Sequence, residues 1–199
     1  MATRLGHDHA LSATPGPIVF SGMIGSRPLR VRLEDYDGIH TEVLERLAED
    51  LASDGGGVAN SPWDVAVVLV ADPEPRRAAG ATWLIRRWAE AGHPPPAPAL
   101  ETLSGSLPTV TDKWARLHLI QAVPALPLTD DRVPAWADFC RAGAAAEAPF
   151  LRAWAVNALV HLASIDAELE PEAEAALEAA LSDPKASVRA RARRILEGR

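Results

Sequence analysis

The chain has 199 residues, enough for one domain with a sizeable core, and its formal net charge of −7 argues against nucleic acid or an anionic membrane as the main partner. Apolar residues make up 48% of the chain but aromatic residues only 5%, and its many alanines favour closely packed helices. A single cysteine, Cys140, cannot form an internal disulfide, so we expect a cytoplasmic protein. No stretch reaches 18 apolar residues and the N-terminus lacks a signal-peptide pattern, so we expect no membrane span.

The N-terminal part of the chain differs in character from the rest. Residues 1–17 mix Gly, His, Ser, Thr and Pro without periodicity, which predicts a disordered leader. In residues 18–35, Leu29, Val31 and Leu33 alternate with charged residues, and this period of two favours a strand. We therefore predict that residues 18–35 form a short β-hairpin or an extended arm over the first helices, since the end of a helical stack needs such a cover.

From residue 36 onward, apolar residues recur at helical spacing between prolines, glycines and aspartates. The run Val65–Val70 fits a buried strand by propensity alone, but the repeat of the chain makes it the first helix of a pair. The helices that we predict span about residues 38–51, 62–70, 75–91, 99–104, 112–123, 131–144, 149–163, 171–181 and 183–196.

One short pattern recurs along this helical region. It consists of a hydrophobic residue, an arginine directly after it, a small residue three positions after the arginine and an aliphatic residue seven after it. The reference positions are His40, Arg77, Arg116, Arg152 and Arg189, which are separated by 37, 39, 36 and 37 residues. Such intervals are typical of stacked helical hairpins, because one pair of helices cannot bury its apolar face alone.

The pattern resembles HEAT repeats, in which the second helix of each hairpin carries such an arginine behind an Asp-Pro-like turn. The resemblance covers residues 36–199 and implies an all-α fold, a right-handed α-α superhelix (HEAT-like solenoid) of about four to five hairpins. It also implies a structural ladder of charge pairs along the stack, in which Asp72 pairs with Arg77, Asp112 with Arg116 and Asp183 with Arg189, while Arg152 follows a turn that has no aspartate.

Polar residues occupy one position of every unit, five after the reference residue, where the chain has Glu45, Thr82, Gln121, Asn157 and Arg194. Since each residue advances about 100° around a helix, positions one before and three, six and seven after the reference face the core, and the polar position faces away from it. The resemblance to HEAT repeats implies that the second helices line a concave binding surface, formed here by Arg86, His118, Gln121, Trp154, Asn157, His161, Arg191 and Arg194. Trp154 is either a binding anchor on that surface or, if the helix is rotated by one position, a residue packed between repeats.

Enzymatic motifs are absent from the sequence, which has no metalloprotease helix motif, no nucleophile elbow and no glycine-rich phosphate loop. We therefore predict a non-enzymatic adaptor or scaffold that binds a protein or peptide on the concave face, with no catalytic residue, no metal and no cofactor. The alternative is a HEAT-like enzyme or accessory factor that acts on nucleic acid, as alkylpurine DNA glycosylases do, or on a cofactor, as HEAT-like lyases and chaperones do. The acidic balance argues against nucleic acid, whose binding is dominated by phosphate neutralisation.

Overall fold

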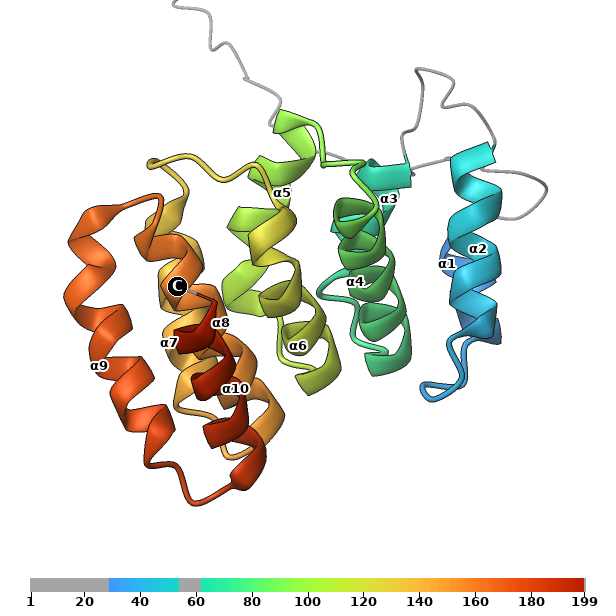
Figure 1. The fold of residues 1–199 in the computed structure, drawn as a ribbon. Helices are drawn as coiled ribbons and strands as arrows, with labels where there is room; N and C mark the ends of the chain where they lie inside the picture. Colours follow the sequence, from blue (N-terminus) through green and yellow to red (C-terminus); the bar gives the residue numbers. More distant parts are fainter. Residues whose placement is uncertain (1–28, 54–61, 199) are drawn as a thin grey trace, which may run out of the picture.

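The computed structural model describes residues 29–53 and 62–198. Within these residues the fold is all-α, with ten α-helices, four short 3-10 turns and no strand (Figure 1). The prediction of an all-α protein is therefore confirmed. None of the described helices combines the length and the apolar character that crossing a membrane requires.

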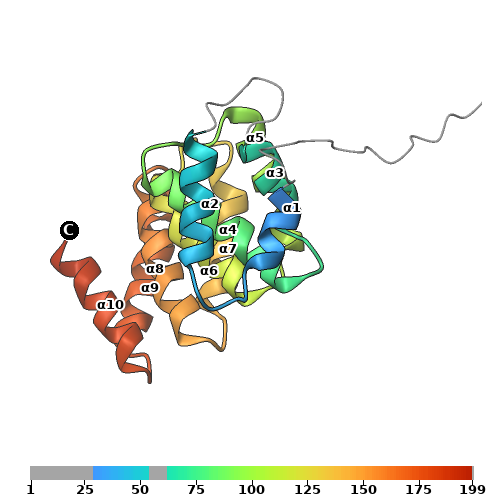
Figure 2. The ribbon, with the colours of Figure 1, turned by 90° about the vertical axis from the view of Figure 1, so that its right-hand side faces the viewer.

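The helices form two rows, and consecutive helices alternate between them. The first row contains α1 (Leu29–Arg32), α3 (Pro62–Leu69), α5 (Ala97–Ser106), α7 (Val133–Ala144) and α9 (Glu170–Leu181). The second row contains α2 (Glu42–Ser53), α4 (Pro75–Glu90), α6 (Lys113–Ala122), α8 (Pro149–Ala163) and α10 (Ala186–Glu197). Each second-row helix packs on the next in chain order, and Figure 2 views the rows from the α2 end. Segments about one repeat apart in sequence therefore lie side by side.

Local sequence signals explain where the helices begin and end. Six helices, namely α3, α4, α5, α7, α8 and α9, have a proline in the first turn, where its fixed φ suits the helix and its missing N–H costs no hydrogen bond. α6 begins at Asp112, whose carboxylate accepts hydrogen bonds from the backbone N–H groups of Trp114 (2.9 Å) and Ala115 (2.8 Å). α4 ends just before Gly92, whose φ of +82° is unstrained only for glycine.

One hydrophobic core extends between the rows from α1 to α9, and a smaller cluster joins α8, α9 and α10. Small residues let the helices approach closely. At Gly143, for example, an added Cβ would lie 2.7 Å from Ile120 Cδ1. Trp136 is fully buried between the helices, and its indole N–H donates to the Ser104 hydroxyl at 3.0 Å. The core is therefore close-packed at this contact, and the buried indole N–H has a hydrogen-bond partner.

Residues 29–35 are helical, so the predicted strand is wrong for this part of the arm. α1 continues into a 3-10 turn at Leu33–Asp35, and Leu29 and Leu33 are both fully buried. Their spacing of four residues places them on one side of a helix, whereas Val31 between them is only half-buried. The predicted leader and the rest of the predicted arm, residues 1–28, lie outside the described residues.

The first unit of the repeat departs from its prediction as well. The helix predicted from residue 38 begins at Glu42, because the Asp37 carboxylate accepts hydrogen bonds from the backbone N–H groups of Ile39 (2.8 Å) and His40 (2.9 Å) and holds a turn before it. Ile39 was predicted to face the core but is 78% exposed. The buried side chains of α2 include Leu44, Leu47 and Leu51. His40 is therefore not equivalent to the reference arginines.

Candidate binding face on helices α4, α6, α8 and α10

Asp72, in the turn before α4, forms hydrogen bonds and an ion pair within the protein. Asp72 Oδ1 accepts hydrogen bonds from Arg77 Nε (3.1 Å) and Nη2 (2.9 Å), and Asp72 Oδ2 lies 3.3 Å from a guanidinium nitrogen of Arg30. Burial alone would raise the pKa of Asp72, whose side chain is 4% exposed. The hydrogen bonds from Arg77 and from the Glu74 backbone N–H, together with the charges of Arg77 and Arg30, outweigh burial and lower the pKa. This arrangement fixes the turn to its own helix and to α1.

Asp183 and Asp112 have partners other than the predicted ones. The Asp183 carboxylate accepts from Arg152 of the preceding unit, Nε at 2.8 Å and Nη2 at 3.0 Å, whereas Arg189 donates to the Asp183 backbone oxygen at 2.6 Å. Asp112 caps α6, and Arg116 donates at 3.4 Å to the carbonyl oxygen six residues before it. The hydrogen bonds predicted between the side chains of Asp112 and Arg116 and of Asp183 and Arg189 are therefore not formed, although the charge of Arg189 helps to lower the pKa of Asp183. Arg152 also donates to the carbonyl oxygens of Ala146 (2.9 Å) and Glu147 (2.7 Å) in its own turn.

One side of the second-row helices carries the residues two before and two, five and nine after the reference arginine. These positions are four, three and four residues apart, so they lie along one side of a helix. In α4 they are Pro75, Ala79, Thr82 and Arg86; in α6 and the turn after it, Trp114, His118, Gln121 and Ala125; in α8, Phe150, Trp154, Asn157 and His161; and in α10, Ser187, Arg191 and Arg194. We term this side the second-row face, and it contains all eight predicted binding residues.

The second-row face is closed between α4 and α6. Thr82 is fully buried, and its hydroxyl lies 3.2 Å from His118 Nδ1, which is itself 3.1 Å from the Ala79 carbonyl oxygen. His118 is 8% exposed, and its burial, together with the positive charge of Arg86, lowers its pKa to about 4. The prediction that these positions face away from the core is therefore wrong at Thr82 and His118, because small residues such as Ala79 let the two helices meet.

Arg86 and Gln121 complete the contact between α4 and α6. The Arg86 guanidinium donates to Gln121 Oε1, and its Nε lies 3.7 Å from Glu90 Oε1. Arg86 and Gln121 are both half-buried. These two predicted binding residues therefore hold each other across the helix contact.

Aromatic and basic side chains are concentrated on the part of the second-row face that α6, α8 and α10 form. The rings of Trp114 and Phe150 stack with centroids 5.0 Å apart and planes 3° from parallel, and Lys113 Nζ lies 5.6 Å from the Trp114 centroid. One unit further on, the Arg191 guanidinium lies 3.6 Å from the Trp154 ring centroid. Trp114 is 42% exposed, whereas Trp154 is partly buried against the core. Stacking thus links α6 to α8 and α8 to α10.

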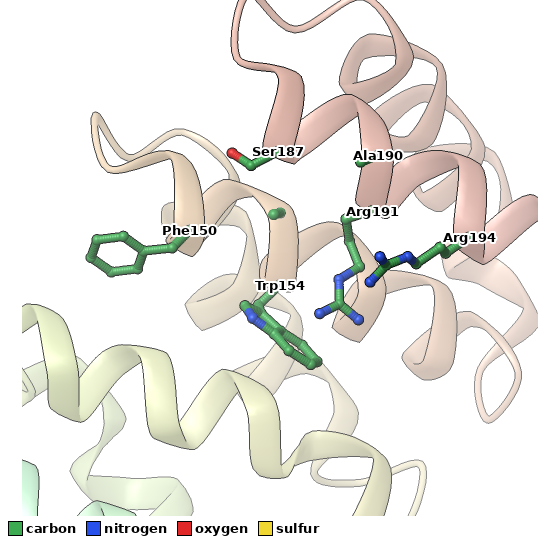
Figure 3. A pocket seen from close by; sticks show the side chains of 7 residues that line it. Phe150, Trp154, Ser187, Ala190, Arg191 and Arg194 are labelled. Atoms are coloured by element: carbon green, nitrogen blue, oxygen red, sulfur yellow. The ribbon is translucent and has the colours of Figure 1, made fainter.

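A pocket of about 280 Å³ lies between α8 and α10. It is lined by Phe150, Ala153, Trp154, Ser187, Ala190, Arg191 and Arg194. Figure 3 shows the Arg191 and Arg194 guanidinium groups reaching from α10 toward the Trp154 ring, with Phe150 at the opposite end of the pocket. Burial and the nearby charge of Arg194 lower the pKa of Arg191. No carboxylate of the described chain lines this pocket, and the described residues contain no group of three potential metal ligands.

The remaining predicted residues, Asn157 and His161, continue the face along α8 and are half-buried. Burial lowers the pKa of His161 below its usual value. The polar column of the repeat did not indicate Trp114 and Phe150, although each lies four residues, about one helical turn, before a predicted binding residue. That spacing is the signal in the sequence by which they can be found.

Comparison of the chain with protein-family models, curated proteins and solved structures found no match in any of the three. The resemblance to HEAT repeats therefore rests on the residue pattern of the chain itself. The chemical features of the second-row face are one exposed aromatic ring, Trp114, two partly buried ones, Phe150 and Trp154, and the guanidinium groups of Arg191 and Arg194.

Proposed function

We propose that this protein is a HEAT-like α-solenoid adaptor that binds a protein or peptide segment across the second-row face at α6, α8 and α10. Two observations support the solenoid: consecutive helices alternate between two rows, and each second-row helix packs on the next. A face that continues from unit to unit lets an extended partner contact several helices at once. The proposed partner lies along the row and crosses from the Trp114–Phe150 stack to the pocket beside Trp154.

The observation that carries this proposal is the rigid aromatic surface at α6 and α8. Trp114 is one of the few large apolar side chains of the described residues that is well exposed, at 42%. Aromatic residues dominate the energetics of many interfaces because they bury a large area and lose little conformational entropy. Trp114 is already held parallel to Phe150, so binding orders it little further and more of the contact energy contributes to affinity.

Local charge indicates the chemistry of the partner. Lys113, Arg191 and Arg194 surround the aromatic rings, in a chain whose net charge is −7. Acidic side chains are exposed on the other row, for example Glu174 and Glu178 of α9. Charge complementarity therefore favours an acidic segment that also carries an apolar or aromatic residue for the Trp114–Phe150 stack.

The alternative, an enzyme or accessory factor for nucleic acid or a cofactor, has one observation in its favour. Aromatic rings beside arginines also suit the bases and phosphates of single-stranded nucleic acid. A base-excising enzyme of the glycosylase type requires a carboxylate beside the aromatic residue, and the described residues that line the pocket include none. The net charge of −7 also opposes nucleic acid. We therefore favour the protein partner.

Site-directed photo-cross-linking tests the proposal. A photoreactive residue at Ala190, which is exposed and lines the pocket, should capture a protein from cell extract, and the capture should survive nuclease treatment. The same residue at Val68, which is 54% exposed on first-row helix α3, is the matched control and should capture far less. Equal capture from both positions would reject the proposed face. Capture of nuclease-sensitive material at Ala190 would instead support the alternative.

Substitution of the aromatic anchor gives an independent measurement. Trp114→Ala should reduce recovery of the protein captured at Ala190 about tenfold, since truncation of an interface aromatic typically costs more than 1 kcal/mol. Val68→Ala removes an exposed apolar side chain from the other row and should leave recovery unchanged. Equal recovery by both variants would show that the aromatic surface is not the binding site.

A further inference from the structure

We infer that the pocket between α8 and α10 is an oxyanion site, in which Arg191 and Arg194 together hold a carboxylate or phosphate group of the bound segment. The inference rests on the proposed function and deepens it, because it names the chemical group that the partner must present. The supporting observations are the unpaired state of these arginines, the orientation of one of them and the position of the pocket at a helix N-terminus.

Several arginines at contacts between helices and turns have carboxylate partners. Arg77 pairs with Asp72, Arg152 with Asp183 and Arg141 with Glu172. Arg191 and Arg194 line the pocket, yet within residues 29–53 and 62–198 neither has an ion pair or donates a side-chain hydrogen bond. Two neighbouring cations without an anion repel each other, and an oxyanion between them relieves that repulsion.

Stacking orients Arg191 for this role. Its guanidinium carbon lies 3.6 Å from the Trp154 centroid, and stacking of this kind uses the flat face of the group. The N–H donors of a guanidinium lie in its plane and point outward from its edge. Contact with Trp154 therefore leaves these donors free for an oxyanion and restricts the motion of the side chain, which lowers the entropy lost on binding.

The N-terminal turn of α10 adds favourable electrostatics. Ser187, the second residue of this twelve-residue helix, lines the pocket and offers a hydroxyl. The N-cap residue, Lys185, provides no side-chain cap for the backbone N–H groups of the first turn. The partial positive charge of a helix N-terminus attracts anions, so it acts in the same direction as the two guanidinium groups.

The pocket is continuous with the aromatic surface, because Phe150 both lines the pocket and stacks on Trp114. A bound segment that crosses from α6 to α10 meets the apolar rings first and the guanidinium pair next. The expected recognition element is therefore an apolar or aromatic residue followed, in one chain direction, by an acidic or phosphorylated residue.

Small aromatic anions test the oxyanion site directly. We expect benzoate and phenyl phosphate, titrated into the ¹⁵N-labelled full chain, to shift the Trp154 indole N–H resonance, which is assigned by its loss in Trp154→Phe. The two ligands are the carboxylate and phosphate arms, and the tighter of them identifies the preferred group. Benzamide, which matches benzoate in shape but is neutral, should bind at least tenfold more weakly. Equal binding of benzamide and both anions would overturn the inference.

Arginine variants assign the effect to the pair. Arg191→Gln and Arg194→Gln should each weaken anion binding about tenfold, as expected for the loss of charge-assisted hydrogen bonds. Arg193→Gln is the matched control, because Arg193 is exposed on the same helix but does not line the pocket, and it should leave the affinity within about twofold. An equal loss in Arg193→Gln would mean that only general charge acts, which overturns the site. Arg194 is exposed, so its variant tests the site even if Arg191→Gln folds poorly.

Failure of this inference can be told from failure of the proposed function. If anions bind as expected while Trp114→Ala leaves capture of the protein unchanged, the oxyanion site stands and the adaptor function fails. If Trp114→Ala abolishes capture while Arg191→Gln and Arg194→Gln leave anion binding unchanged, the adaptor function stands and the oxyanion site is wrong.

Discussion

The two ends of the second-row face carry polar residues at equivalent positions but use them differently. Between α4 and α6, Thr82 and His118 are buried and hydrogen-bonded to the helix backbone and to each other. Between α8 and α10, Arg191 stacks on Trp154 and a pocket remains beside them. Two positions after the reference, the α4–α6 contact has Ala79 and His118, whereas the α8–α10 contact has Trp154 and Arg191.

The difference shows that the size of the facing residue on the neighbouring helix decides whether a polar side chain at this position of the repeat is buried or remains at the surface. The small Ala79 lets the His118 imidazole reach its carbonyl oxygen, and α4 and α6 pack extensively. Two large side chains at the same level of α8 and α10 fill the surface without closing it. The first arrangement buries its polar groups in hydrogen bonds, whereas the second leaves the guanidinium groups without a carboxylate partner among the described residues.

The largest expected effect comes from truncating the same position in both halves. His118→Ala removes a buried side chain and its hydrogen bond, so we expect it to lower the free energy of unfolding by about 3 kcal/mol. Arg191→Ala removes one stacked, partly exposed cation and should cost less than about 1 kcal/mol. Urea denaturation of both variants measures the difference. If both variants lowered the free energy of unfolding equally, the side chains between α4 and α6 would be packed no more tightly than those between α8 and α10.

Lowering the pH should weaken the closed half through the same histidine. The pKa of His118 is about 4 in the folded protein and about 6.5 in an unfolded chain, so between these values the unfolded state binds more protons. Stability from neutral His118 is therefore complete above about pH 6.5 and is lost as the pH falls toward 4, by about 2 kcal/mol at about pH 5.

His118→Asn isolates this contribution, because its amide keeps an N–H donor but does not titrate in this range. The difference in free energy of unfolding between the native protein and this variant should shrink from about pH 7.5 to about pH 5. A difference that stays constant over this interval would show that the histidine titrates normally in the folded state.

Much of the helical framework can be predicted from the sequence. Once the reference arginine of a unit is identified, the repeat pattern predicts which side of that helix faces the core. Leu151, Ala155, Ala158 and Leu159 of α8 were assigned to the core by this pattern, and all four are buried. The pattern is weakest at the ends of the array. Leu196 was also assigned to the core but is 46% exposed, on the helix at the end of the described array.

The depth of the candidate site could not be predicted in the same way. Because Thr82 is polar, it was predicted to face away from the core. Its hydroxyl instead donates to the carbonyl oxygens of Ala78 (2.9 Å) and Ala79 (3.0 Å), so the side chain can be fully buried. The sequence also did not predict which aspartate each arginine contacts. The ion pair between Arg152 and Asp183, for example, depends on how one hairpin packs on the next. Both outcomes depend on distances between helices, which a single sequence does not state.

A smaller effect is expected from removing a hydroxyl in each half. Thr82→Val keeps the shape of a buried side chain but loses its hydrogen bonds, so we expect a cost of about 1 kcal/mol. Ser187→Ala removes an exposed hydroxyl at the rim of the pocket and should change stability by less than about 0.5 kcal/mol. Thermal denaturation compares the two. If Ser187→Ala lowered stability more than Thr82→Val, the hydroxyl that contributes more to stability would lie between α8 and α10, contrary to the comparison.

The smallest effect on stability, but a decisive one on binding, is expected from introducing a carboxylate five positions after the reference in each half. Arg194→Glu alters an exposed side chain and should change the free energy of unfolding by less than about 0.5 kcal/mol. It replaces a cation of the pocket with an anion, so recovery of an acidic partner should fall at least tenfold.

Gln121→Glu introduces the same carboxylate beside Arg86, where a positive charge already faces position 121. We expect it to leave stability within about 0.5 kcal/mol and to leave recovery of the partner nearly unchanged, because Arg86 neutralises the new charge within the closed half. Urea denaturation and quantitative recovery on both variants separate the two halves. If Gln121→Glu reduced recovery as much as Arg194→Glu, binding would extend over α4 and α6, and the division of the second-row face into a structural half and a binding half would be wrong.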